Sequence, residues 1–234
     1  MVNLAIMQPT FLPWAGYFNL ISSATDFIFL DDVQLEKQSW QTRNRLLLNG
    51  GVQWITLPIR NESISQKITE TNILMDARWK KKFTTSFSMN YGRHPNFISA
   101  KEIVDELIRC EDMRLSEVNE KIIRLIVTRL KLSTKLHTAS KLNINGVRTQ
   151  RLISFCDHFS ATTYLSPVGA SKYLELDGFE KYSTSQLNFQ DFQSRPYNQF
   201  GNKEFVPGLS MLDVIANLGW KETRKYIDQE YCNE

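Results

Sequence analysis

Cysteine is scarce in this chain of 234 residues and falls at three distant positions: Cys110, Cys156 and Cys232. The odd number and wide spacing exclude a disulfide framework and a paired Cys-x-x-Cys metal site. The three histidines also lack the spacing of metal ligands. We therefore expect a reducing compartment and no bound metal.

Long apolar runs are also missing. Residues 1–24 are rich in apolar side chains, but no lysine or arginine precedes them, and Gln8, Pro9 and Pro13 interrupt the run. A membrane-spanning helix needs about 20 mainly apolar residues, and a signal peptide begins with basic residues. We expect neither a membrane span nor a signal peptide, and the cytoplasm is the expected location.

Neither sign of charge is in large excess. The 28 basic and 25 acidic side chains give a net charge of +3, spread along the chain without a basic stripe, so nucleic acid is not an expected partner.

The signatures GxxxxGK[ST], GxGxxG, HExxH and GxSxG are absent. We expect no classical nucleotide loop and no tightly bound cofactor. The 42% apolar content is typical of globular proteins, and a homo-oligomer is compatible with it.

The pattern of apolar segments predicts an α/β fold. Residues 3–7 and 26–30 have the pattern of buried strands on either side of a helix at 15–24, which predicts a βαβ unit with a parallel pair. Asn49-Gly50 predicts the turn of a hairpin, because both residues tolerate positive φ angles. A helical insert is expected over 76–131, with Asp76 as a helix cap and the strongest helix at 115–130.

The last third predicts a C-terminal α/β part. Its expected strands are 135–140, 163–166 and 186–190, and its expected helices are 148–159, 169–174 and one capped by Ser210 that ends near Leu218, followed by a final helix. We expect a single domain over residues 1–234, with sub-parts at 1–75, 76–131 and 132–234.

Polar side chains follow the first two predicted strands. Gln8 follows the first, and Asp31, Asp32 and Gln34 follow the second. The carboxyl ends of parallel strands meet at one edge of a sheet, where ligand sites form. Trp40, Arg43, Asn44 and Arg45 come next. Together they combine a general base, cationic groups for an anion and hydrogen-bonding amides. The alternative is structural: Asp31 and Asp32 would cap a turn and pair with Arg43 or Arg45.

Three other places have a functional and a structural interpretation. Cys156 is a candidate nucleophile, but its neighbours form an apolar helix face that favours a buried structural cysteine. The segment 164–171 joins a strand to a helix. In the functional interpretation its backbone would approach an anion at the helix N-terminus, and in the structural one it is a plain tight connection. The aromatic loop at 191–209 would stack on a sugar or base, or cover the edge of the core.

Several motifs carry a family resemblance. The runs MQPTFLPWAGYFNLI, DDVQLEKQSWQTRNRLLLNGGVQWITLPI, NYGRHPNF, RLISFC, YLSPVGASKYL and YNQF resemble the WbqC-like family, in family order over nearly the whole chain. The resemblance implies a role in building or modifying an unusual sugar, because such genes accompany O-antigen, lipopolysaccharide and other surface-glycan genes. One departure is Ser166-Pro167, where the family has a Ser-Gly pair.

The resemblance also implies a set of shared polar residues. They are Gln8, Tyr17, Asp31, Asp32, Gln34, Trp40, Arg43, Asn44, Arg45, Tyr91, Ser140, Arg151, Cys156, Tyr164, Ser166, Gly169, Tyr173, Tyr197, Gln199, Ser210 and Asp213.

These residues lead to an expected reaction, the N-acylation or aminoacylation of a nucleotide-linked amino sugar. Asp31 or Asp32 would be the base, Asn44 or Gln8 would orient the substrate or stabilise an oxyanion, and Arg43 and Arg45 would hold phosphates. We expect Tyr17, Gln34, Trp40, Ser166, Tyr197 and Gln199 to bind substrate. The co-substrate would be an acyl or aminoacyl donor. Two alternatives stand: a Cys156-dependent acyl transfer or amidase enzyme, and a non-catalytic accessory protein that binds a sugar nucleotide.

Overall fold

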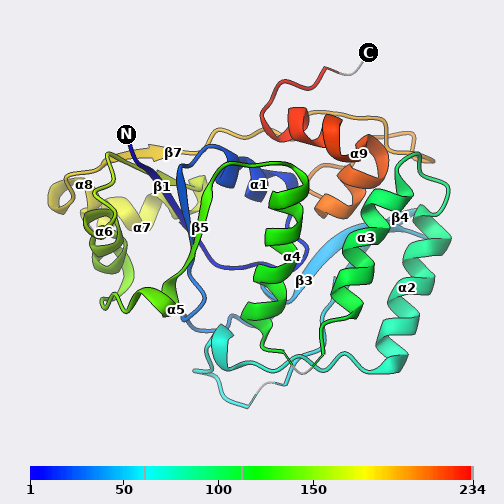
Figure 1. The fold of residues 1–234 in the computed structure, drawn as a ribbon, viewed down its shortest axis with the longest axis horizontal. Helices are drawn as coiled ribbons and strands as arrows, with labels where there is room; N and C mark the ends of the chain where they lie inside the picture. Colours follow the sequence, from blue (N-terminus) through cyan, green and yellow to red (C-terminus); the bar gives the residue numbers. More distant parts are fainter. Residues whose placement is uncertain (61, 112, 233–234) are drawn as a thin grey trace.

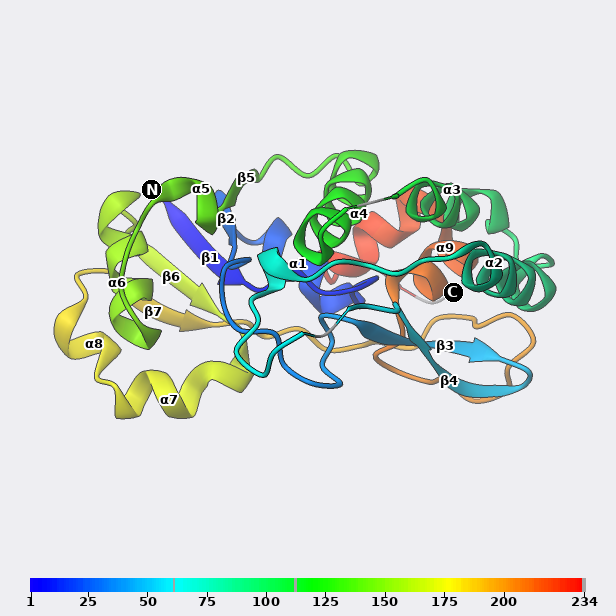
Figure 2. The same ribbon diagram turned by 90° about the horizontal axis from the view of Figure 1, so that it is seen from below.

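The computed structural model describes residues 1–60, 62–111 and 113–232 and has a mixed α/β fold, as the sequence predicts. Its larger sheet has five parallel strands in the order β5-β2-β1-β6-β7 (Figure 1; all five strands are labelled in Figure 2). These strands are β1 (Asn3–Met7), β2 (Asp26–Phe29), β5 (Lys135–Thr138), β6 (Thr163–Ser166) and β7 (Gln186–Phe189).

The predicted βαβ unit is present at the centre of this sheet. β1 pairs in parallel with β2, with Leu4 opposite Asp26, and α1 (Ala15–Ser22) joins them. All four residues of β2 are buried. Strands covered on both faces are expected to be apolar along their whole length, which explains the uninterrupted apolar character of residues 27–29.

Helices cover both faces of the sheet. Consecutive strand residues point to opposite faces. Ala5, Phe27 and Phe29 pack in one cluster with α1, α4 (Leu115–Arg129) and α9 (Met211–Ile227). Leu4 and Ile28 belong to a second cluster with α6 (Arg148–His158), α7 (Ser171–Leu176) and α8 (Phe179–Tyr182).

The predicted hairpin and helical insert lie beside the sheet. β3 (Arg43–Leu48) and β4 (Gly51–Thr56) form a separate two-stranded sheet, and their turn has φ angles of 53° at Asn49 and 75° at Gly50. Figure 2 shows this hairpin next to α2 (Ala77–Tyr91), far from β7, with α3 (Phe97–Ile108) on the other side of α2. The Asp76 carboxylate caps α2 by accepting from the Trp79 N–H at 2.7 Å.

Some boundaries and short elements differ from the prediction. β5 ends at Thr138 instead of residue 140, because Ala139–Leu142 turns into the short helix α5. The short 3-10 helices η1 (Ile68–Glu70) and η2 (Val168–Ala170) are further additions. The helical segment after Ser210 bends at Gly219, whose φ of 69° is not helical, so two helical pieces follow one another as predicted. None of the described helices is long and apolar enough to cross a bilayer.

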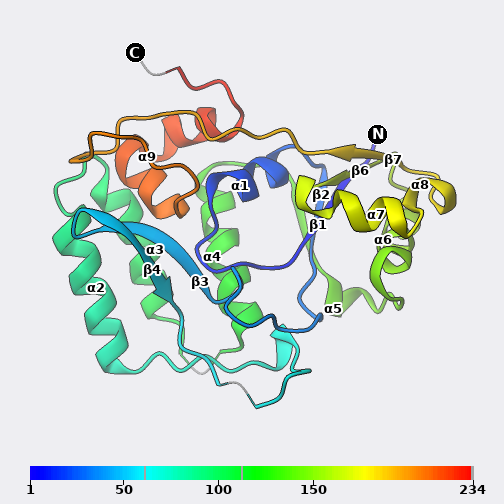
Figure 3. The same ribbon diagram turned by 180° about the vertical axis from the view of Figure 1, so that it is seen from behind.

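A buried carboxylate ties the helical side of the molecule together. Asp213 accepts hydrogen bonds from the Tyr91 hydroxyl at 2.8 Å and the Tyr197 hydroxyl at 2.5 Å. The Nε2 of Gln199 lies 3.3 Å from the same carboxylate. The Tyr91 hydroxyl also accepts from the Leu47 N–H of β3. Burial raises the pKa of Asp213, and the hydrogen bonds from its partners work against that rise. Asp213 therefore joins α9, α2, the hairpin and the loop at 191–209 (Figure 3).

We predict that Asp213→Ala lowers the free energy of unfolding by about 2–4 kcal/mol, because it leaves two buried tyrosine hydroxyls without an acceptor. Urea denaturation followed by circular dichroism measures the loss. Asp191→Ala removes an exposed carboxylate from the same loop and should change stability by less than about 0.5 kcal/mol. Equal stability of the two variants would contradict the role given to Asp213.

Candidate functional site

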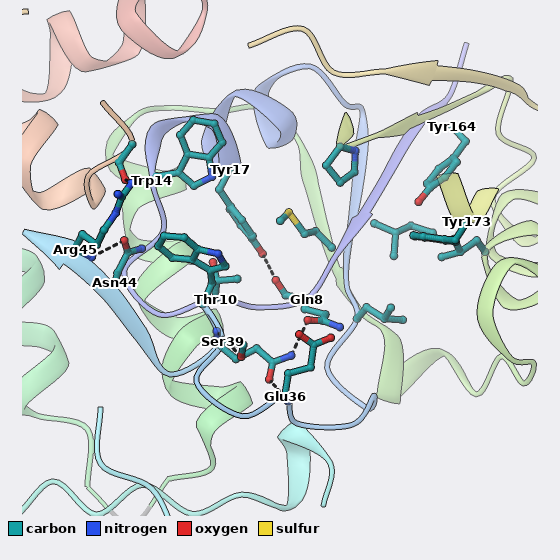
Figure 4. Close-up of a pocket in the computed structure, with 18 residues that line it drawn as sticks. Gln8, Thr10, Trp14, Tyr17, Glu36, Ser39, Asn44, Arg45, Tyr164 and Tyr173 are labelled. Carbon is teal, nitrogen blue, oxygen red and sulfur yellow. Dashed lines mark hydrogen bonds between the residues drawn. The ribbon is translucent and has the colours of Figure 1, made fainter. Parts of the chain in front are cut away.

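A cavity of about 550 Å³ lies at the carboxyl ends of β1 and β6. Its lining from the two strands and the residues that follow them is Ile6, Met7, Gln8, Tyr164 and Pro167. Trp14, at the start of α1, and Asn44 and Arg45, within β3, lie on its far side (Figure 4), and Trp40, before β3, also lines it. We call it the first cavity.

The strand order explains why a cavity forms at this place. From β1 the chain builds outward to β2 and β5 on one side, and it later returns to β6 and β7 on the other side. The connections that leave β1 and β6 therefore diverge, and they open a crevice between the two strand ends. Ligands of open α/β sheets bind at such a switch point. The position of the first cavity is that of a ligand site.

A chain of side-chain amides sets the polarity of the cavity wall. The backbone N–H of Glu36 donates to Gln41 Oε1 at 3.0 Å, and Gln41 Nε2 donates to Gln8 Oε1 at 2.6 Å (Figure 4). A backbone N–H can only donate, so it fixes the donor and acceptor of both hydrogen bonds. Gln8 accepts through its oxygen, which leaves its NH2 group to donate to a ligand. The Glu36 carboxylate borders the same cavity.

The opposite end of the first cavity is cationic and aromatic. Arg45 donates to the Gly208 carbonyl oxygen at 3.0 Å, and its guanidinium carbon lies 5.6 Å from the centre of the Trp40 ring. Its Nε is buried and has no hydrogen-bond partner among the described residues. Buried donors are nearly always satisfied, so this unpaired atom is an exception in the wall of the cavity.

Two expected site residues hold the cavity wall in place. The Asn44 amide donates to the Phe11 and Leu12 carbonyl oxygens, at 3.1 and 2.8 Å, and accepts from the Arg45 N–H. Both of its N–H groups are therefore used within the protein. The Tyr17 hydroxyl donates to the Gln8 carbonyl oxygen at 3.1 Å. Burial raises the pKa of Tyr17, with a contribution from Glu120, so the hydroxyl stays a donor.

A second cavity of about 890 Å³ adjoins the first. Four residues border both: Gln8, Leu30, Leu152 and Tyr173. Asp32 and Gln34, both expected in the site, line the second cavity. Both Asp32 oxygens accept from Arg151 on α6, at 2.8 and 2.6 Å. The partner of Asp32 is thus Arg151, not the Arg43 or Arg45 considered from the sequence.

Asp31 lies on a different wall from Asp32. One Asp31 oxygen accepts from the Ser140 N–H at 2.9 Å and the other from the Ser140 hydroxyl at 2.6 Å. Asp31 and Ser140 border a third cavity, together with Glu120 and Arg124. The two adjacent carboxylates are therefore separated into different cavities, because successive side chains diverge after a strand.

Four more expected residues lie outside the lining of the first two cavities. The Arg43 guanidinium stacks 4.4 Å from the centre of the Trp54 ring on the hairpin. Ser166 is fully buried, and its hydroxyl donates to the Pro167 carbonyl oxygen. Tyr197 and Gln199 are buried against Asp213. The loop at 191–209 contributes Gly208 to the first cavity instead.

Some lining residues were missed by reasoning from the sequence alone. Glu36 and Gln41 lie between the expected Gln34 and Asn44, and their polar character was a signal that went unused. Trp14 lies within a quoted motif, and Tyr173 belongs to the shared polar set but was not among the residues expected to bind substrate. In the part of the chain that the structure describes, no group of three or more histidine, cysteine, aspartate or glutamate side chains could hold a metal ion.

Cys156 is a core residue of α6. It is 1% exposed and packs in the cluster that contains Leu152 and Phe155. Burial raises the pKa of its thiol to about 11, while the thiolate is the nucleophilic form. The geometry therefore supports the structural interpretation of this cysteine.

Comparison with known proteins identifies the family. Residues 8–225 match the WbqC-like protein family, and the chain belongs to it. A protein of Mycobacterium tuberculosis (strain ATCC 25618 / H37Rv), named "Uncharacterized protein Rv1507c", is 32% identical over 239 residues, which cover 100% of both chains. No solved structure matches the chain significantly.

The burial of the cysteines leads to a prediction. With excess iodoacetamide at pH 8, Cys232 of the native protein should be alkylated first, because it is exposed while Cys110 and Cys156 are buried. Burial also raises the pKa of Cys110. Peptide mass spectrometry over time measures each site, and the protein unfolded in guanidinium should react at all three. Alkylation of native Cys156 at the rate of Cys232 would restore it as a candidate nucleophile.

Proposed function

We propose that this WbqC-like protein is a transferase that acylates or aminoacylates the amine of a nucleotide-linked amino sugar in surface polysaccharide or O-antigen biosynthesis. The observation that carries the proposal is the amide chain that orients Gln8 as a donor beside the Glu36 carboxylate. A donor and a proton acceptor on one wall are what acyl transfer to an amine requires. The family membership supports the sugar substrate.

The proposed step uses these two side chains for oxyanion stabilisation and proton transfer. The sugar amine attacks the carbonyl carbon of an activated acyl or aminoacyl donor, and a nitrogen–carbon bond forms. The Gln8 NH2 group donates to the carbonyl oxygen while negative charge develops on it. The Glu36 carboxylate takes one proton from the nitrogen and returns it to the leaving group as the bond between carbon and leaving group breaks.

The rest of the first cavity suits the acyl donor. Ile6, Met7, Leu30 and Leu152 supply an apolar lining for an acyl chain or an amino acid side chain. Arg45 and Trp40 would bind a charged or planar part of the donor at the far end, since both line the cavity there and the guanidinium lies beside the aromatic ring. The donor is a co-substrate in this proposal, and no tightly bound cofactor is required.

The structure changes which carboxylate we propose as the base. Asp31 accepts from Ser140 and Asp32 from Arg151 through both oxygens, whereas Glu36 borders the first cavity. We therefore propose Glu36 as the base. We propose Tyr17 and Asn44 as positioning residues that hold the backbone at Gln8 and at residues 11–12 after it.

Gln8→Glu tests the donor. The substitution keeps the oxygen that accepts from Gln41 and removes the NH2 group, so we expect kcat to fall by about 10²–10³-fold. Product formation is measured by mass spectrometry with UDP- and dTDP-linked amino sugars and with acyl-coenzyme A or aminoacyl donors. Gln53→Glu makes the same chemical change on the exposed face of the hairpin and should leave the rate unchanged. A Gln8→Glu rate equal to that of Gln53→Glu would contradict the proposed role.

The base is tested by comparing three carboxylates. We expect Glu36→Gln to lower kcat by about 10²–10⁴-fold, the range for loss of a general base. Asp31→Asn and Asp32→Asn are matched controls that should retain far more of the rate. If Glu36→Gln retains the rate of these controls, Glu36 is not the base. Sugar-nucleotide binding with no product for any donor would instead favour the accessory-protein interpretation.

A further inference from the structure

The second cavity carries an excess of positive charge that the proposed acyl-transfer step does not use. Its charged lining residues, within the described chain, are Lys67, Arg148, Arg151 and Asp32. The two arginines come from α6 and the lysine from the segment before η1, so the cations reach the cavity from two separate elements. The lining thus has three basic side chains against one carboxylate, a positive excess that attracts anions.

Arg151 is held in one orientation. Its two terminal nitrogens bind the Asp32 carboxylate, and its Nε donates to the Ile144 carbonyl oxygen at 2.9 Å. Each terminal nitrogen still has a second N–H. The Arg151 side chain is 14% exposed and already ordered, so it loses little further conformational entropy when an anion binds.

The loop at 144–147 packs closely against Arg151. Gly146 has a φ angle of 137°, and a Cβ at this position would lie 2.9 Å from the Arg151 Cα. Other residues are therefore excluded from this position by both conformation and space. The loop at 144–147 lines the cavity directly against the guanidinium.

Arg148 and Lys67 are exposed and can turn toward a ligand with little loss of existing interactions. The Arg148 side chain is 69% exposed, and its ion pair with Asp177 measures 3.1 Å. Exposed ion pairs are weak, so Arg148 can exchange Asp177 for a phosphate with little loss. Lys67 is exposed at the cavity edge. The second cavity thus combines one fixed cation with two adaptable ones.

We infer that the second cavity binds the diphosphate of a ligand that extends through the Gln8 border into the first cavity. The inference rests on the proposed function for the identity of that ligand. A diphosphate fits because its charge exceeds what one arginine balances, and because an apolar and aromatic border of Leu30, Leu152 and Tyr173 follows it. Nucleotide-linked sugars and coenzyme A thioesters both contain a diphosphate, and the same cations would recognise either.

Binding measurements by isothermal titration calorimetry test the inference. The probes are inorganic pyrophosphate, UDP, dTDP and coenzyme A. We expect Lys67→Ala/Arg148→Ala to weaken binding of the recognised probe by about tenfold or more, since charge-assisted hydrogen bonds to phosphate are lost. Lys81→Ala/Lys82→Ala removes the same charge from exposed positions of α2 and should leave binding unchanged. Circular dichroism checks that both variants are folded.

Each outcome decides the inference. Selective binding of UDP or dTDP assigns the diphosphate to the sugar nucleotide, and selective binding of coenzyme A assigns it to the acyl donor. Failure to bind any probe, or equal weakening in both double variants, overturns the inference. Loss of probe binding in Lys67→Ala/Arg148→Ala alone, without acyl transfer in the wild type, would support the site and reject the proposed function. Acyl transfer with an unchanged KM in that variant would support the proposed function and reject the diphosphate site.

Discussion

β1 lies in the middle of a parallel sheet, and the chain extends from it in opposite directions on its two sides. This pairing separates the connections after β1 and β6 and places Gln8 at the point where they diverge. Both of the first two cavities border Gln8, so their existence depends on the strand order. The apolar residues of β1 and β2 hold that order because helices bury both faces of the strands.

Paired carboxylates account for much of the polar chemistry that connects segments of the fold. Asp31, Asp32 and Asp213 each have donors on both oxygens or on several sides. A carboxylate removed from water is costly unless it is paired. Ser140, Arg151, Tyr91 and Tyr197 supply those pairs. Part of the shared polar set implied by the family resemblance is therefore used to connect segments of the fold.

The two adjoining cavities differ in chemistry, and that difference organises the proposed reaction. The first is mainly apolar, with one carboxylate and one arginine at its ends, and suits an acyl group. The second is cationic and suits phosphates. Gln8 lies at their common border with its amide direction fixed by the backbone N–H of Glu36. An amine carried on a nucleotide and an activated carbonyl would meet at that border.

Local patterns by themselves determined the βαβ unit, the Asn49-Gly50 hairpin and the caps Asp76 and Ser210, because strand periodicity, turn geometry and capping depend on neighbouring residues. The sequence also identified the segment that contains most of the first cavity's polar wall. Only the tertiary structure decided how those side chains are used. Asp31 and Asp32 are adjacent, yet their partners lie 109 and 119 residues away in sequence. Such pairings follow from helix packing over the sheet, which no local pattern encodes.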